Sequence, residues 1–171
     1  LVYKWYKIPY VITEHASSIN GNQTTPSQAV ILKKAYSEAR KIICVGTKLK
    51  RSLCAYVSDP DKVTVIPNFV DTNTFAFSPH RTEKEKHFTF ISIGNLNKRK
   101  GFWDLLTAFH WAFKDMPHVS LIIAGDGEEM QPLKKLIQSL HLQEQVKLTG
   151  RLSREELSGL LGTCDAFVLA S

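Results

Sequence analysis

The sequence has 171 residues, enough for one large or two small domains, and its 43% hydrophobic and 22% charged residues are typical of a folded globular protein. No stretch approaches the roughly 20 apolar residues of a membrane-spanning helix. The formal net charge of +6 favours an anionic partner, which could be a phosphate-bearing ligand, a nucleic acid or an acidic membrane surface.

The three cysteines, Cys44, Cys54 and Cys164, form no CxxC pair, and each stands among apolar neighbours. A free cysteine in such surroundings behaves as a small buried hydrophobic side chain. This usage favours a reducing compartment. We therefore expect a cytoplasmic protein, with the inner face of the membrane as an alternative location.

The first part of the sequence alternates apolar runs rich in β-branched residues with stretches of helical period. A polar loop separates the first strand from the first helix. Thr47 is expected to cap the second helix, which reaches about Val57. The predicted strands cover residues 9–13, 41–45 and 63–66, and the first helix covers residues 27–39.

A run rich in Ser, Pro, Thr and charged residues follows, from residue 71 to about residue 86, and its lack of any period indicates a linker. The alternation of strands and helices then restarts. Ser153 and Glu156 match a capping box at the start of the last helix. The predicted strands cover residues 87–93, 119–124, 146–149 and 166–170, and the helices cover residues 102–115, 128–140 and 153–162.

Strands that alternate with helices of about ten to fifteen residues indicate βαβ units with parallel strands and right-handed crossovers. We therefore predict an α/β protein with two Rossmann-like parallel sheets, neither of them complete. The predicted boundaries are residues 1–76 for the first domain, 77–86 for the linker and 87–171 for the second domain.

Ligands of parallel α/β sheets bind beyond the carboxyl ends of the strands, so the residues that follow each strand are the first candidates for a site. Glycine and polar residues gather there, among them Gly94-Asn95, Gly125 and Gly150-Arg151. Turns need glycine for reasons of their own, which accounts for part of this pattern.

The sharpest local feature is the loop from Gly94 to Gly101, which contains Lys98-Arg99-Lys100 and leads into a predicted helix. A helix N-terminus offers free backbone N–H groups and the positive end of the helix dipole, and Lys100 adds a full charge beside them. A diphosphate suits such a site, because the charge of a diphosphate leaving group is neutralised there in the transition state. A solvated basic turn is the alternative interpretation.

His15 ends the first predicted strand beside a loop without charged residues. A histidine in this position could contact a sugar hydroxyl or transfer a proton. A strand-end histidine that only bonds to the backbone is the alternative.

Several other segments resemble functional motifs but lack the residues or the position in the fold that those motifs require. Gly125-Asp126-Gly127 begins like GxGxxG but lacks the third glycine. Asp59-Pro60-Asp61 has the form of a DxD metal site, yet it lies at the wrong edge of the sheet and reads as a surface turn. The sequence contains no P-loop, no zinc-ligand spacing and no nucleophile elbow, so we expect neither a metal nor a cofactor.

Four segments, in order and at natural spacing, resemble motifs of the family 4 retaining glycosyltransferases of GT-B fold. They read VIPNFVDTNTF (65–75), ISIGNLNKRKGFWDLL (91–106), LIIAGDGEEMQPLKKLI (121–137) and VKLTGRLSREELSGLLGTCDAFVLAS (146–171). Upstream, PYVITEHASSI resembles the acceptor-domain strand that ends in the active-site histidine of the family. The resemblance covers nearly the whole chain.

The resemblance implies that a nucleotide-diphosphate sugar, UDP- or GDP-linked, lies in a cleft between the domains and is held mainly by the second. Lys100 matches the diphosphate-binding lysine of the family, and Arg151 falls where members contact the nucleobase. Asn95 stands where many members have an arginine, which removes one positive charge from the diphosphate site. Gly94 and Gly125 complete the implied donor-binding set.

His15 matches the histidine that faces the transferred sugar, which implies a catalytic role. Members of the family are hexosyltransferases that retain the anomeric configuration and need no metal. The implied acceptor is a carbohydrate or a lipid-linked molecule of glycan or glycolipid biosynthesis. Peripheral contact with a membrane is implied for a lipid-linked acceptor, and a nucleic-acid partner is not expected.

The family also has a pair of glutamates just after a strand such as residues 166–171, and a glycine-rich loop early in the acceptor domain. Neither feature occurs in this sequence. We therefore expect the sequence to be an internal fragment that is inactive by itself.

Two other classes of function stay open. An NAD-dependent oxidoreductase would share the parallel sheets, although the broken fingerprint at Gly125 argues against it. A non-catalytic basic module for nucleic acid or acidic lipid would use the net charge. The sequence lacks a compact basic face with interleaved aromatic residues, because Trp103, Phe109 and Phe113 are expected in the core.

Overall fold

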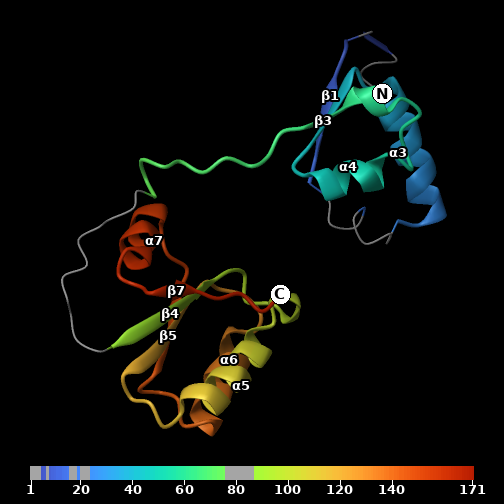
Figure 1. The fold of residues 1–171 in the computed structure, drawn as a ribbon. Coiled ribbons are helices and arrows are strands. Elements are labelled where there is room, and N and C mark those ends of the chain that lie inside the picture. Colours follow the sequence, from blue (N-terminus) through green and yellow to red (C-terminus); the bar gives the residue numbers. More distant parts are fainter. Residues whose placement is uncertain (1–4, 7, 16–18, 20–23, 76–86) are drawn as a thin grey trace. The chain divides into compact units, whose positions relative to one another are not determined.

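The computed structural model describes residues 5–6, 8–15, 19, 24–75 and 87–171. The chain divides into two compact units, Leu1–Val70 and Asp71–Ser171 (Figure 1). Within the second unit, the Ser158 hydroxyl donates a hydrogen bond to the Thr74 carbonyl, so the first residues of this unit are attached to helix α7 (Arg154–Leu161). The predicted linker, residues 77–86, lies outside the described residues, and the predicted domain boundaries stay predictions.

The first unit contains a parallel sheet of three strands in the order β1-β2-β3. Glu14 of β1 lies opposite Cys44 of β2, and Cys44 lies opposite Val65 of β3, so the carboxyl ends of the strands meet at one edge of the sheet. The strands are β1 (Val11–Glu14), β2 (Lys41–Cys44) and β3 (Val63–Val65), and the helices are α3 (Pro26–Glu38) and α4 (Thr47–Leu53). One hydrophobic cluster joins both helices to the sheet.

Helix α4 differs from its prediction at both ends. Its N-cap is Gly46, which makes no side-chain hydrogen bond, so the prediction that Thr47 caps the helix is wrong. Gly46 leaves the strand in an extended conformation, and Thr47 is already the first helical residue. The helix ends at Leu53 rather than near Val57, because the next turn tightens and Tyr56 N–H donates to the Leu53 carbonyl at 2.8 Å.

The cysteines follow the prediction only in part. Cys44 is buried and Cys164 is half-buried, whereas Cys54 is exposed. Burial of Cys54 was expected from its apolar neighbours. Helix α4 instead buries Leu49 and Leu53, and Cys54 follows at the end of the helix on the solvent side.

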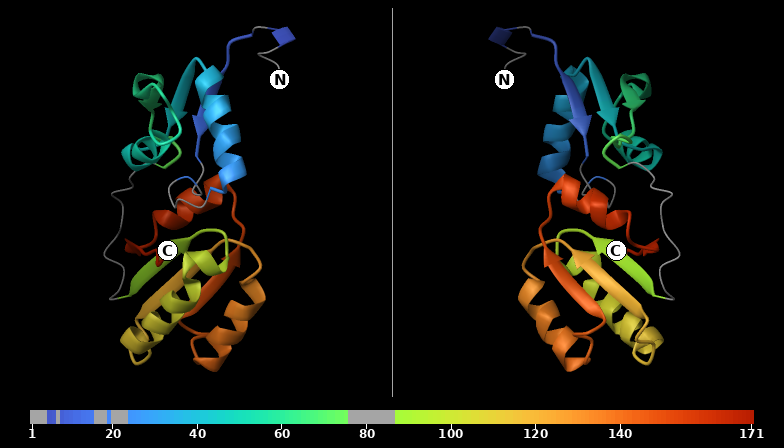
Figure 2. Two further views of the ribbon diagram at one scale, coloured as in Figure 1. Left: turned by 90° about the vertical axis from the view of Figure 1, so that its right-hand side faces the viewer. Right: turned by 90° about the vertical axis from the view of Figure 1, so that its left-hand side faces the viewer.

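The second unit contains a parallel sheet of four strands in the order β6-β5-β4-β7. Helices α5 and α6 lie side by side on one face of this sheet, and α7 lies on the other face (Figures 1 and 2). The strands are β4 (Phe88–Ile93), β5 (Val119–Ala124), β6 (Val146–Gly150) and β7 (Ala166–Phe167), and the helices are α5 (Phe102–Phe113), α6 (Met130–Ser139) and α7 (Arg154–Leu161). The predicted α/β fold with two parallel sheets is confirmed.

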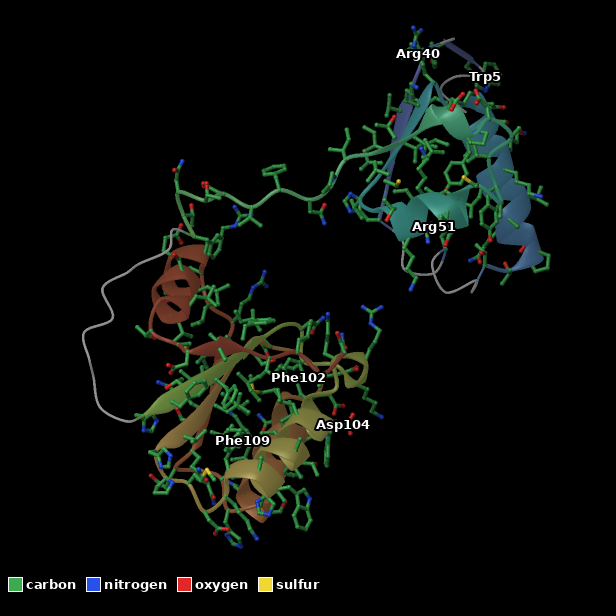
Figure 3. All side chains as sticks on the ribbon, in the orientation of Figure 1. Trp5, Arg40, Arg51, Phe102, Asp104 and Phe109 are labelled. Atoms are coloured by element: carbon green, nitrogen blue, oxygen red, sulfur yellow. The ribbon has the colours of Figure 1, made fainter. Side chains whose placement is uncertain are left out.

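Helix α5 follows the prediction except at Trp103: Phe109 is buried and Phe113 packs against the core. The helix begins at Phe102 as predicted, and its buried residues recur at helical spacing: Phe102, Leu105, Leu106 and Phe109 are 0–8% exposed. Trp103 is 44% exposed, and its expected place in the core is wrong. Figure 3 shows Phe102 and Phe109 on the sheet side of the helix and Asp104 on the outer side.

The capping box at the start of α7 is confirmed. Glu156 N–H donates to Ser153 Oγ at 3.2 Å, and Ser153 N–H donates to Glu156 Oε2 at 2.7 Å. The bond from the Ser153 backbone N–H, followed by interaction with the Ser153 hydroxyl, lowers the pKa of the Glu156 carboxyl by stabilising its charged form. Among the helices that the structure describes, none combines the length and the apolar character of a membrane span.

Candidate functional site

The carboxyl ends of three strands of the second unit are joined by backbone hydrogen bonds. Gly94 N–H, after β4, donates to the Ala124 carbonyl of β5 at 3.0 Å. Gly125 N–H, after β5, donates to the Gly150 carbonyl of β6 at 2.9 Å. The residues that follow β4, β5 and β6 therefore form one continuous rim, which is where the rule for parallel sheets places a ligand.

Two positions in this rim require glycine. A Cβ atom on Gly125 would lie 1.9 Å from the Gly94 carbonyl oxygen, and the φ of Gly125 is +148°. A Cβ atom on Gly127 would lie 2.5 Å from the Leu96 carbonyl oxygen, at a φ of +155°. The loops after β4 and β5 thus approach each other more closely than any side chain allows.

A pocket of about 440 Å³ opens above this rim. Gly94, Asn95, Gly125 and Arg151 line it, together with Asp126 and other residues of the strand ends. The structure thereby brings together four of the predicted donor-binding residues.

Lys100 lies beside the N-terminus of α5. It ends a short 3-10 helix (Lys98–Lys100), and Gly101, with a φ of +65°, turns the chain into α5. The helix has no side-chain N-cap, and the positive end of its dipole lies at this turn. Lys100 does not line the pocket above the rim.

A contact that the sequence did not predict ties these loops together. Trp103 Nε1–H, in the first turn of α5, donates to Glu129 Oε2 at 2.7 Å. Glu129 is 7% exposed, and its backbone N–H donates to the Leu96 carbonyl at 2.9 Å. Glu129 thus connects the N-terminus of α5, the loop after β4 and the start of α6. No local pattern pairs residues that are 26 positions apart.

His15 lies in the first unit, as the first residue after β1, and it is exposed. Its backbone N–H donates to Glu14 Oε1 at 3.1 Å. The hydroxyl of buried Tyr36 donates to Glu14 Oε2 at 2.7 Å. Burial, followed by the bond to the Glu14 carboxylate, raises the pKa of Tyr36 well above its ordinary value.

The aspartates of the DxD-like segment have a local role. Asp59 is the N-cap of a short 3-10 helix (Pro60–Lys62), and Asp61 N–H donates to its Oδ1 at 3.0 Å. They therefore form a capped turn rather than an open pair of carboxylates. Within the described part of the chain, no group of three or more His, Cys, Asp or Glu side chains could hold a metal ion.

Models of two protein families match the chain. Residues 74–171 match the model described as glycosyl transferases group 1, and residues 1–74 match the model described as glycosyltransferase family 4. The chain belongs to the glycosyl transferases group 1 family. The prediction that the chain belongs to the family 4 glycosyltransferases of GT-B fold is confirmed.

Curated relatives of the chain come from archaea, fungi and bacteria. A glycosyltransferase of Methanocaldococcus jannaschii is 31% identical over 134 residues, which are 72% of this chain and 33% of the relative. The phosphatidylinositol N-acetylglucosaminyltransferase gpi3 subunit of Schizosaccharomyces pombe is 26% identical over 77% of this chain and 29% of its own length. The alpha-monoglucosyldiacylglycerol synthase of Streptococcus pneumoniae is 25% identical over 96% of this chain and 42% of its own length. The chain therefore spans less than half the length of each of these relatives.

Solved structures show the same fold. The Anabaena protein HepE in complex with UDP has a TM-score of 0.79 at 21% identity, over 96% of this chain and 47% of HepE. The pneumococcal O-GlcNAc transferase GtfA in complex with UDP and GlcNAc has a TM-score of 0.75 at 19% identity, over 99% of this chain and 34% of GtfA. At these identities the likeness establishes the fold, and the roles of individual residues stay predictions.

Proposed function

We propose that this protein transfers a sugar from a nucleotide-diphosphate sugar to an acceptor, with retention of the anomeric configuration. The observation that carries the proposal is the pocket above β4, β5 and β6, lined by Gly94, Asn95, Gly125 and Arg151. The family membership of the chain supports a transferase, and two structural neighbours were solved with UDP.

The electrostatics of the second unit suit a diphosphate. The N-terminus of α5, which has no side-chain cap, and the adjacent Lys100 supply positive charge. When the sugar leaves, negative charge builds up on the diphosphate, and groups already in place to receive it lower the barrier. We assign Lys100 to the diphosphate and the backbone at Arg151 to the nucleobase.

His15 is the proposed catalytic residue of the first unit, where it faces the transferred sugar. Its position directly after a strand of a parallel sheet is where ligand-contacting residues are expected. An imidazole can exchange a proton with a sugar hydroxyl near neutral pH. The proposed chemistry uses this chain's own side chains and backbone, and no metal enters it.

The acceptor is proposed to be a carbohydrate or a lipid-linked molecule of glycan or glycolipid biosynthesis. Residues 1–70 contain ten basic residues (Lys or Arg) and four acidic residues (Asp or Glu). Residues 71–171 contain twelve basic and twelve acidic residues. The whole net charge therefore lies in the first unit. Such a unit attracts a phosphate-bearing acceptor or an acidic membrane surface. This charge supports a cytoplasmic location with peripheral contact to the inner face of the membrane.

The test is product formation by the full-length protein over a panel of UDP- and GDP-sugars with lipid and carbohydrate acceptors. We expect transfer from one nucleotide sugar and thermal stabilisation by the matching nucleotide diphosphate. Stabilisation by NAD instead, with no transfer, would overturn the proposal in favour of an oxidoreductase. Because the chain spans less than half of each relative above, we expect these 171 residues alone to show no transfer.

A further inference from the structure

The Glu14 carboxylate, at the end of β1, accepts hydrogen bonds from the Tyr36 hydroxyl and from the His15 backbone N–H. Its Oε2 accepts the hydrogen bond from the Tyr36 hydroxyl at 2.7 Å, and its Oε1 accepts the one from the His15 backbone N–H at 3.1 Å. Tyr36 is 1% exposed, so its hydroxyl reaches Glu14 from inside the core of the first unit. Glu14 is also the last residue of β1, opposite Cys44 of β2.

We propose that Glu14 and Tyr36 are positioning residues for His15. This inference rests on the function proposed above, in which His15 faces the transferred sugar. Glu14 and Tyr36 act through His15 and do not touch the substrate.

The ladder between β1 and β2 ends at Glu14, so strand pairing does not orient the backbone of His15. The bond from His15 N–H to the Glu14 carboxylate takes over this task, and it sets the direction in which the histidine side chain leaves the main chain. A carboxylate on a surface strand end would normally sample several rotamers. The hydroxyl of Tyr36 selects one of them, because a hydrogen bond to a charged acceptor is short and strong.

Tyr36 is suited to this role by its surroundings. Its ring packs in the hydrophobic cluster of the first unit, on helix α3. A buried phenol needs a hydrogen-bond partner, and leaving it without one costs more than the bond itself is worth. A phenol is protonated, and therefore a donor, throughout the physiological range, and burial together with the bond to Glu14 raises the pKa of Tyr36 further.

The chain beyond His15 is anchored to the same core. Ile19 is 2% exposed and belongs to the same hydrophobic cluster as Tyr36. Thr24 Oγ1 and Tyr56 Oη lie 2.6 Å apart, within hydrogen-bonding distance. The described residues on either side of the loop therefore hold His15 between fixed points, which a positioning role requires.

The first test compares two tyrosines that each donate a hydroxyl bond between the β1 segment and α3. Tyr36→Phe removes the bond to Glu14, and Tyr10→Phe removes a 2.8 Å bond to the Ala35 carbonyl, away from His15. In the full-length enzyme we expect Tyr36→Phe to lower kcat about tenfold, with KM for the nucleotide sugar changed less than twofold. Tyr10→Phe should leave both constants unchanged. Thermal unfolding curves verify that both variants are folded. Equal kcat values in the two variants would then overturn the inference.

The second test separates position from charge. In Glu14→Gln the amide oxygen can accept from His15 N–H while the amide nitrogen donates to the Tyr36 oxygen. We expect Glu14→Gln to retain kcat within about threefold and Glu14→Ala to lose at least about tenfold. A loss in Glu14→Gln as large as in Glu14→Ala would show that the charge matters rather than the geometry, and would overturn the inference.

His15→Ala, measured beside these variants, distinguishes the two proposals. If the unaltered enzyme transfers no sugar, or if His15→Ala retains full turnover, the function proposed for His15 fails and this inference fails with it. If His15→Ala loses turnover while Tyr36→Phe and Glu14→Ala do not, only the positioning inference fails.

Discussion

The indole N–H of Trp103 donates a 2.7 Å hydrogen bond to the carboxylate of Glu129, which is 7% exposed. Trp103 belongs to the first turn of α5, and Glu129 immediately precedes α6. The bond therefore joins the starts of the two helices that follow the rim of the pocket. It also gives a buried carboxylate the donor it needs, since an unpartnered buried charge is strongly unfavourable.

Trp103→Phe is expected to lower the free energy of unfolding by about 2 kcal/mol, because Glu129 loses its charge-assisted partner. The matched control is Trp111→Phe on the same helix. Trp111 is 75% exposed, and the Lys114 ammonium and the edge-on His110 ring each lie 5.9 Å from its ring centroid, so the change to Phe, which keeps an aromatic ring, should cost less than about 0.5 kcal/mol. Urea denaturation measures the free energy of unfolding of both variants. Equal losses in the two variants would contradict a structural role for the Trp103 bond.

Gly125→Ala should damage the rim of the pocket. The added Cβ would meet the Gly94 carbonyl oxygen at 1.9 Å in a backbone conformation that side chains rarely adopt, so we expect a loss of roughly 3 kcal/mol. Gly159→Ala, in α7, meets nothing within 4 Å and should stabilise the protein by about 0.5 to 1 kcal/mol. Thermal unfolding of the two variants measures this difference. A Gly125→Ala protein as stable as Gly159→Ala would contradict the close approach of the two loops.

His15→Ala in the full-length enzyme should lower turnover at least about tenfold, which corresponds to about 1.4 kcal/mol of lost transition-state stabilisation. The dissociation constant of the nucleotide diphosphate should stay unchanged, because the proposed diphosphate and base contacts belong to the second unit. Steady-state kinetics and calorimetry measure the two quantities, with exposed His118→Ala as the control. Unchanged turnover would show that His15 is only structural.

Much of the fold could be predicted because its signals are local. The strand Val119–Ala124 was predicted with its observed bounds, since a short apolar run between turn residues admits few other structures. The capping box of Ser153 and Glu156 was recognisable because both partners lie within one turn. The gathering of Gly94, Asn95, Gly125 and Arg151 followed from the rule for strand ends in parallel sheets.

The errors arose where a residue's place depends on more than its neighbours. Trp103 was assigned to the core with Phe109 and Phe113 as a large aromatic side chain of α5, but it is 44% exposed and its indole N–H bonds to Glu129. The bond from Trp103 to Glu129 forms only after two loops meet in the folded unit, so no spacing announces it. The bond between Tyr36 and Glu14 was missed for the same reason, since the two residues are 22 positions apart in the sequence.

The central claim is that the second unit binds the diphosphate of a sugar nucleotide beside Lys100, and calorimetry on Lys100→Ala tests it most directly. Binding of the nucleotide diphosphate to the full-length protein should weaken by about 2 kcal/mol, or roughly 30-fold, because one charge-assisted contact is lost. Binding of the free nucleoside should change less than twofold, and Lys135→Ala, an exposed position on α6, should alter neither. Equal losses for nucleoside and nucleotide diphosphate, or no loss for either, would contradict the placement of the diphosphate at the N-terminus of α5.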